Sequence, residues 1–184
     1  MIGGGTYKDG DLSQIRSGMR HLREEGAIEG EPHYVLGDIL HLPLKEHAVD
    51  KIAEKDMIFH HLGPQRKKIA EQYWRVLRPG GKALMFVTGG CGGLGYSNRR
   101  RINYDREIED LSGVLRRQWF HVALSDGICL DSGIREIGEF AGIRGYRPLD
   151  VLYGKDHMHR EFFPNSFMIV ATKPGHRRRR KRSK

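Results

Sequence analysis

The sequence of 184 residues has few cysteines and no long apolar run. Cys91 and Cys129 are too few for a disulfide framework, and neither lies near a second cysteine or a histidine at zinc-ligand spacing. No stretch approaches the roughly 18 apolar residues of a membrane span. The N-terminus, Met-Ile-Gly-Gly-Gly, lacks the basic region and apolar core of a secretory signal. We therefore expect a cytoplasmic chain with no metal site and no membrane span.

Charge is concentrated at one end of the chain. The sequence is 38% hydrophobic and 30% charged, which is typical of a water-soluble protein with one domain. The formal net charge is +9, and residues 176–184 supply seven of the positive charges. Such a run repels itself, so we expect a single domain over 1–175 and a disordered basic tail over 176–184. Contact with RNA phosphates, a nuclear or nucleolar address in a eukaryote, and a solubilising role all remain open for this tail.

Helical and strand-like segments alternate along the chain. Apolar periodicity predicts helices over 11–26, 63–81, 105–118 and 132–142, and strands over 32–38, 51–62, 82–89, 146–154 and 166–174. This alternation predicts an α/β fold whose sheet is mostly parallel and covered on both faces. The last two strands are joined by a non-helical connection, so we expect an antiparallel edge at the C-terminal end of the sheet.

A glycine-rich turn follows the apolar strand over 82–89. Gly90 to Gly95 fit the G-x-G-x-x-G pattern of a dinucleotide-binding turn. Such a turn opens directly into a helix, whereas residues 96–101 show little apolar periodicity. The Tyr-x-x-x-Lys pair and the Asn-Ala-Gly turn of short-chain dehydrogenases are also missing. These observations argue against a dehydrogenase and favour a loop that leads to the basic run Arg99 to Arg101.

Four short motifs occur in a fixed order. Asp-Leu-Ser opens the helix at residue 11, and Gly-Asp-Ile-Leu-His-Leu-Pro-Leu (37–44) follows a strand. His-His-Leu (60–62) precedes the next helix, and Arg-Val-Leu-Arg-Pro-Gly-Gly (75–81) ends it. In this order the chain resembles class I S-adenosylmethionine-dependent methyltransferases, most of all the branch containing the ubiquinone and menaquinone biosynthesis enzymes. The resemblance covers residues 11 to about 90 motif by motif, and implies a Rossmann-like sheet and S-adenosylmethionine as cofactor.

The resemblance also implies where the cofactor binds. Ligands of open parallel sheets bind beyond the carboxyl ends of the strands. In this family the acid at Asp11 accepts the ribose hydroxyls and the acid at Asp38 accepts the adenine amino group. The cofactor-binding residues that the resemblance implies are Asp11, Leu12, Asp38, Ile39, Leu40 and Lys55. Two alternatives remain open: Asp11 as a helix-start acid stabilised by the dipole, and Asp38 as a turn residue.

On the substrate side the resemblance places His60 and His61, with Arg99 and Arg100 beyond the glycine-rich turn. For His61 a structural role in the loop is the alternative to catalysis. No catalytic residue is assigned, because positioning the methyl carbon in line with a good nucleophile does most of the work in such a transfer. The methyl acceptor is open, with RNA favoured by the basic segments. A non-catalytic domain that binds RNA or a ribonucleoprotein is the alternative function.

The chain departs from the family at its start. The family's first strand, glycine-rich loop and following helix precede the position of Asp11, where this sequence has ten residues, MIGGGTYKDG. We expect residues 6–13 to form the second strand and the first strand to be absent. Such a sheet has a gap with two unpaired edges that a partner chain or a rearranged sheet could fill. A fragment, a mis-started gene product and a family member without its cofactor loop all remain open.

Overall fold

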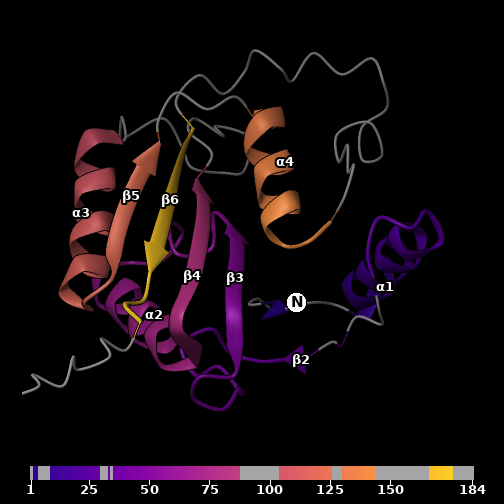
Figure 1. Cartoon of the computed structure of the whole chain (residues 1–184), viewed down its shortest axis with the longest axis horizontal. Helices are drawn as coiled ribbons and strands as arrows, with labels where there is room; N and C mark the ends of the chain where they lie inside the picture. The colour runs from indigo at the N-terminus through magenta and orange to yellow at the C-terminus, as the bar shows by residue number, and fades with distance from the viewer. Residues whose placement is uncertain are drawn as a thin grey trace, which may run out of the picture.

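A computed structural model describes residues 2–3, 9–29, 33, 35–87, 104–125, 130–143 and 166–175. Helices and strands alternate along most of the chain, as the sequence predicts (Figure 1). In chain order the elements are β1 (Ile2–Gly3), α1 (Asp9–Glu24), β2 (Val35–Leu36), β3 (Val49–Lys55), α2 (Gly63–Val76), β4 (Leu77–Val87), α3 (Tyr104–Arg117), β5 (His121–Ser125), α4 (Leu130–Phe140) and β6 (Phe167–Thr172).

The main sheet has four strands in the order β3-β4-β6-β5. β3 and β4 run parallel, whereas β6 is antiparallel to both of its neighbours, β4 and β5. Figure 1 shows β6 between β4 and β5. The predicted Rossmann-like α/β fold with an antiparallel C-terminal edge is therefore confirmed. The strand that pairs with β6 at the edge is β5, which the sequence did not predict; the strand predicted over 146–154 lies outside the described residues.

β1 and β2 form a small parallel sheet of their own. Ile2 pairs with Val35 and Gly3 with Leu36. Within the described ranges no strand joins this pair to the four-stranded sheet. The predicted strand over 6–13 is wrong from Asp9 onward, because α1 already begins there. Acidic residues at a helix start are stabilised by the helix dipole, which explains why this stretch turns helical early.

Two predicted boundaries differ from the structure. The helix predicted over 63–81 ends at Val76, because Leu77 is extended, with φ −70° and ψ 136°. Pro79 cannot donate in a helix, and Gly80 has a φ of 84°, so the Arg-Pro-Gly-Gly stretch begins β4. The strand predicted over 51–62 ends at Lys55, because Asp56 adopts a left-handed φ of 59° that turns the chain.

The core has two layers, one on each face of the main sheet, because successive residues of a strand point to opposite faces. Odd-numbered residues of β4 and β6 pack against α2 and α3 in the larger cluster, and even-numbered residues pack against α4 in the smaller one. The strand residues of the first layer are Leu77, Ala83, Met85, Val87, Phe167, Ile169 and Ala171, and those of the second are Leu84, Phe86, Met168 and Val170. Helices therefore cover both faces of the sheet, as expected.

α1 lies to one side of the main sheet, beyond β2, whereas α3 lies beside β5 (Figure 1). Leu22 near the end of α1 and Ala27 just after it are buried. None of the described helices combines the length and apolar character needed to cross a bilayer. Among the described residues, no cluster of three or more His, Cys, Asp or Glu side chains could hold a metal ion.

Candidate functional site

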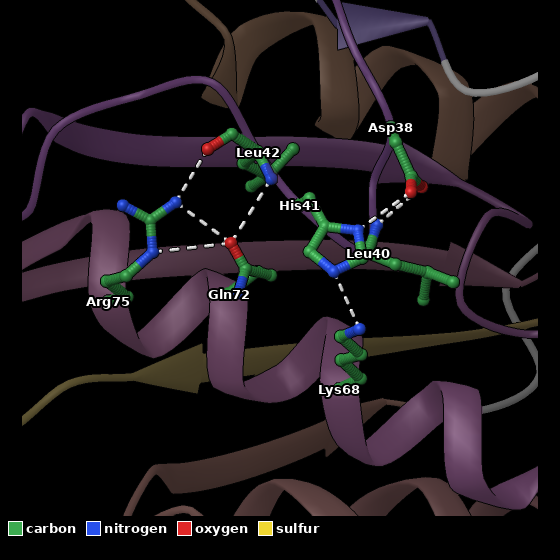
Figure 2. Close-up of polar contacts among 7 residues, drawn as sticks. All are labelled: Asp38, Leu40, His41, Leu42, Lys68, Gln72 and Arg75. Carbon is green, nitrogen blue, oxygen red and sulfur yellow. Dashed lines mark hydrogen bonds and ion pairs between the residues drawn. The ribbon is translucent and has the colours of Figure 1, made fainter.

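Asp38 begins a tight turn just after β2. Its Oδ1 accepts the backbone N–H of Leu40 at 2.8 Å, and its Oδ2 lies 3.0 Å from Nδ1 of His41 (Figure 2). The backbone N–H of His41 also donates to the carbonyl of Asp38, at 2.9 Å. The hydrogen bonds from His41 and Leu40 lower the pKa of the Asp38 carboxyl below its usual value. The turn therefore presents an ionised, exposed carboxylate after a parallel strand.

Lys68 of α2 orients the imidazole of His41. The Nζ of Lys68 lies 2.7 Å from Nε2 of His41. A lysine ammonium donates only, so Nε2 is the acceptor and Nδ1 carries the proton that is directed at Asp38. The contact makes a chain of three polar groups from α2 to the carboxylate.

The segment after this turn is fastened to α2. Gln72 Oε1 accepts the backbone N–H of Leu42 at 3.1 Å. Arg75 donates from Nη2 to the carbonyl of Leu42 at 2.6 Å and from Nη1 to that of Leu44 at 2.5 Å. Figure 2 shows Lys68, Gln72 and Arg75 along one side of α2, at the i, i+4 and i+7 spacing of a helix face. The side chains of Leu42 and Ile39 are buried in the core, which anchors the turn from the other side.

A second turn, residues 56–61, follows the carboxyl end of β3. Lys55 Nζ pairs with Asp56 Oδ2 at 2.6 Å, and the backbone N–H of Asp56 donates to the carbonyl of Phe86 at 2.9 Å. The Asp56 side chain is largely buried, whereas that of Lys55 is 45% exposed. Lys55 therefore lies at the carboxyl edge of the parallel pair β3–β4, with its ammonium accessible to solvent.

The two histidines of this turn have different surroundings. His61 Nδ1 lies 2.7 Å from the carbonyl of Met57, so its ring N–H closes the turn. His60 is exposed, and its ring meets the edge of Phe59 at a centroid distance of 5.8 Å. The hydrogen bond of His61 favours the structural alternative for this residue, and leaves His60 as the accessible imidazole.

Glu54 is a functional candidate that sequence reasoning missed. It lies on β3, accepts the Tyr73 hydroxyl at 2.8 Å and the Ile58 N–H at 3.1 Å, and is partly buried. Burial raises the pKa of Glu54 to about 7, with a further contribution from Asp56. The alternation of side chains along a strand could have identified it, because Glu54 lies two residues after Ile52 and therefore shares the inner face of β3 with it.

α2 is the common support of both turns. Lys68 contacts His41 of the Asp38 turn, and Gln72 and Arg75 bond Leu42 just after it. Arg66 bonds Phe59 of the turn after β3, and Tyr73 bonds the Glu54 carboxylate, which accepts from that turn. The structure thus groups Asp38, Ile39 and Leu40 on one turn, and Lys55, His60 and His61 on and beside the other.

The other predicted site residues are not placed at a strand end. Asp11 and Leu12 lie within α1, not directly after a strand, and their side chains are outside the described part of the chain. Arg99 and Arg100 fall outside the described residues altogether. The expectation that Asp11 directly follows a strand is therefore wrong, because the helix begins two residues earlier.

Residues 9–85 match the family model of the methyltransferase domain. The match spans both turns and the helix between β3 and β4. The chain has the class I methyltransferase fold. No curated protein matches the sequence significantly.

Solved structures share this methyltransferase fold at low sequence identity. An S-adenosylmethionine-dependent methyltransferase from Methanosarcina mazei is 13% identical, with a TM-score of 0.58, over 95% of this chain and 81% of that one. A methyltransferase-like protein from Bacillus halodurans is 16% identical, with a TM-score of 0.50, over 91% and 80%. The [4+2]-cyclase SpnF is 17% identical, with a TM-score of 0.50, over 88% of this chain and 63% of its own. Because one of these structures is a cyclase, the fold alone does not define the reaction.

Proposed function

We propose that this chain binds S-adenosylmethionine and transfers its methyl group to an acceptor. The single observation that supports this most is the Asp38 turn, whose carboxylate is ionised and exposed just after a parallel strand. A carboxylate there accepts the exocyclic amino group of adenine, which donates two hydrogens. The methyltransferase fold and the domain match over 9–85 support the same cofactor. Bound S-adenosylmethionine supplies a methyl group activated by the sulfonium.

The described geometry sharpens the proposed adenine contacts. The N–H of Leu40 is already bonded to Asp38, so the N–H of Ile39 is our choice for an adenine ring nitrogen. We place Lys55 and His60 near the reactive end, because both lie at the carboxyl end of β3. Asp11 and Leu12 are our proposed ribose and adenine-wall residues. Proximity and alignment of the methyl carbon and the acceptor then provide most of the rate.

The methyl acceptor that we propose is RNA. This choice rests on the positive charges of residues 176–184 and on Arg99 and Arg100, which sequence alone identifies. The order of motifs likewise supports kinship with the ubiquinone and menaquinone branch. The low cysteine content supports a cytoplasmic location, and the basic tail supports a nuclear or nucleolar one in a eukaryote.

Isothermal calorimetry with S-adenosylhomocysteine tests the proposal. We expect the wild type to bind, and Asp38→Leu to bind at least ~10-fold more weakly, because leucine is of similar size and offers no oxygen to the adenine amino group. Asp50→Leu is the matched control, since Asp50 is an exposed aspartate that pairs with Arg78 away from both turns. No binding by the folded wild type would refute the enzyme proposal. RNA binding in that case, lost on removal of 176–184 and weakened by salt, would establish the non-catalytic alternative.

A further inference from the structure

The inner face of β3 carries an acid where a core residue is expected. Ile52 and Glu54 face α2, because Ile52 packs against the larger core cluster and Glu54 accepts the hydroxyl of Tyr73. The opposite face of β3 points toward α4, where Lys51 Nζ donates to the carbonyl of Phe140. A carboxylate that faces the core costs folding free energy unless hydrogen-bond donors pair with its oxygens. Its partners therefore indicate what the acid does.

One partner of Glu54 is the backbone of the turn after β3. The N–H of Ile58 lies 3.1 Å from Oε2 and 3.4 Å from Oε1, and the Ile58 side chain is fully buried. The turn begins with Asp56 at a φ of 59°, a conformation that few non-glycine residues adopt. A strained start of this kind persists only where surrounding contacts hold it. The carboxylate is one such contact, from the strand that the turn follows.

The second partner ties the same carboxylate to α2. Tyr73 is buried, and burial together with the adjacent acid raises its pKa well above 10, so its hydroxyl stays protonated and donates. Seven residues earlier on α2, Arg66 donates from Nη2 to the carbonyl of Phe59 at 2.9 Å. The turn is thus held at two adjacent residues in its middle, Ile58 by Glu54 and Phe59 by Arg66. Lys55 directly precedes this turn, and His60 lies within it.

We propose that Glu54 is the positioning residue of turn 56–61: by accepting the Ile58 N–H and the Tyr73 hydroxyl, it fixes Lys55 and His60 at the carboxyl edge of β3. The proposal rests on the proposed function only in placing the reactive end of the cofactor at that edge. Glu54 itself does not contact the cofactor; it acts through the geometry of the turn.

The test compares Glu54→Met with Glu54→Gln in the full chain. Methionine fills the same space without an acceptor, whereas glutamine offers its carbonyl oxygen at the Oε2 position, which accepts both hydrogen bonds. We expect amide exchange at Ile58 to accelerate at least ~10-fold in Glu54→Met and to stay within about twofold of the wild type in Glu54→Gln. S-adenosylhomocysteine affinity follows the same order. Lys51→Met, on the opposite face of β3, is the control that leaves Ile58 exchange unchanged.

Two results overturn the proposal. One is an Ile58 exchange rate that Glu54→Met does not alter, and the other is a Glu54→Gln variant that behaves like Glu54→Met. If Glu54→Met does not fold, Tyr73→Phe decides, because it removes the hydroxyl donor and leaves the Ile58 hydrogen bond. Slow Ile58 exchange in Tyr73→Phe supports Glu54, and fast exchange assigns the turn to α2 instead. If the wild type does not bind S-adenosylhomocysteine, the proposed function fails, while the exchange rates still decide the role of Glu54.

Discussion

The hydroxyl of Tyr73 on α2 donates a 2.8 Å hydrogen bond to the Glu54 carboxylate on β3. This contact joins the helix that supports both turns to the strand at the edge of the main sheet. Because burial disfavours the charged form of the acid, its pKa rises to about 7, close to physiological pH. The protonation of one inward residue is therefore linked to the stability of the domain.

Stability will depend on pH through Glu54. The pKa of the Glu54 carboxyl is raised from 4.5 to about 7 in the folded state, so the folded protein binds this proton more tightly than the unfolded chain. The resulting stabilisation is complete below 4.5 and is lost as pH rises through 7. Lowering pH from about 8 to about 5.5 should stabilise the wild type relative to Glu54→Gln by up to ~2 kcal/mol. Urea unfolding of both proteins at the two pH values measures this, and an identical pH response would contradict it.

Arg66 is expected to be important for the packing of α2 on α3. It is buried, and its Nη1 lies 2.8 Å from both Asp110 and Glu107, while Nη2 donates to the carbonyl of Phe59. Because the two carboxylates are partly exposed, we expect Arg66→Met to cost about 2–3 kcal/mol, less than a fully buried pair. Lys67→Met is the control, since Lys67 is exposed and 3.8 Å from Glu71, and should change the free energy of unfolding by about 0.5 kcal/mol or less. Equal effects in urea unfolding would argue against this role.

Gly133 sets how closely α4 approaches β4. A Cβ at this position would lie 2.3 Å from the Cε2 atom of Phe86, so α4 or the ring would have to shift. We expect Gly133→Ala to destabilise the domain by about 1–3 kcal/mol. Gly113→Ala on α3 is the matched change, because its nearest atom is the flexible end of Arg117 at 3.4 Å, and it should stabilise by up to ~1 kcal/mol. Thermal unfolding measures both effects. Midpoint temperatures that shift in the same direction in Gly133→Ala and Gly113→Ala would refute the prediction.

Arg75 should control the order of the segment after the Asp38 turn. Its guanidinium donates to the backbone carbonyls of Leu42 and Leu44. Methionine at position 75 has no donor, so both carbonyls would lose this hydrogen bond. We expect Arg75→Met to lower the free energy of unfolding by about 2 kcal/mol and to accelerate amide exchange at Leu42. Arg78→Met is the comparison, because Arg78 is exposed and binds Asp50; its cost should stay under about 1 kcal/mol. The two costs can be read from urea unfolding, and an unchanged Leu42 exchange rate in Arg75→Met would disprove the role.

Local patterns predicted some elements well and others poorly. The helices at α3 and α4 and the apolar strand through Phe86 follow their periodicity closely. β5 was missed because most of its residues are exposed, so no alternation marks it. The end of α2 was overestimated because the apolar pattern continues through Leu77, and the change to strand depends on pairing with β3 rather than on local preference.

The sequence by itself determined the alternation of helices and strands, the order of the motifs, and the concentration of charge at residues 176–184. These are local properties, because strands repeat every two residues, helices repeat every 3.6 residues, and each motif spans only a few positions. Only the tertiary structure decided that β6 inserts between β4 and β5, that α2 supports both turns, and that Glu54 meets Tyr73 and Ile58. Burial and pairing between distant segments create these relationships, because the pKa, the partners and the neighbours of a side chain depend on what the fold brings against it.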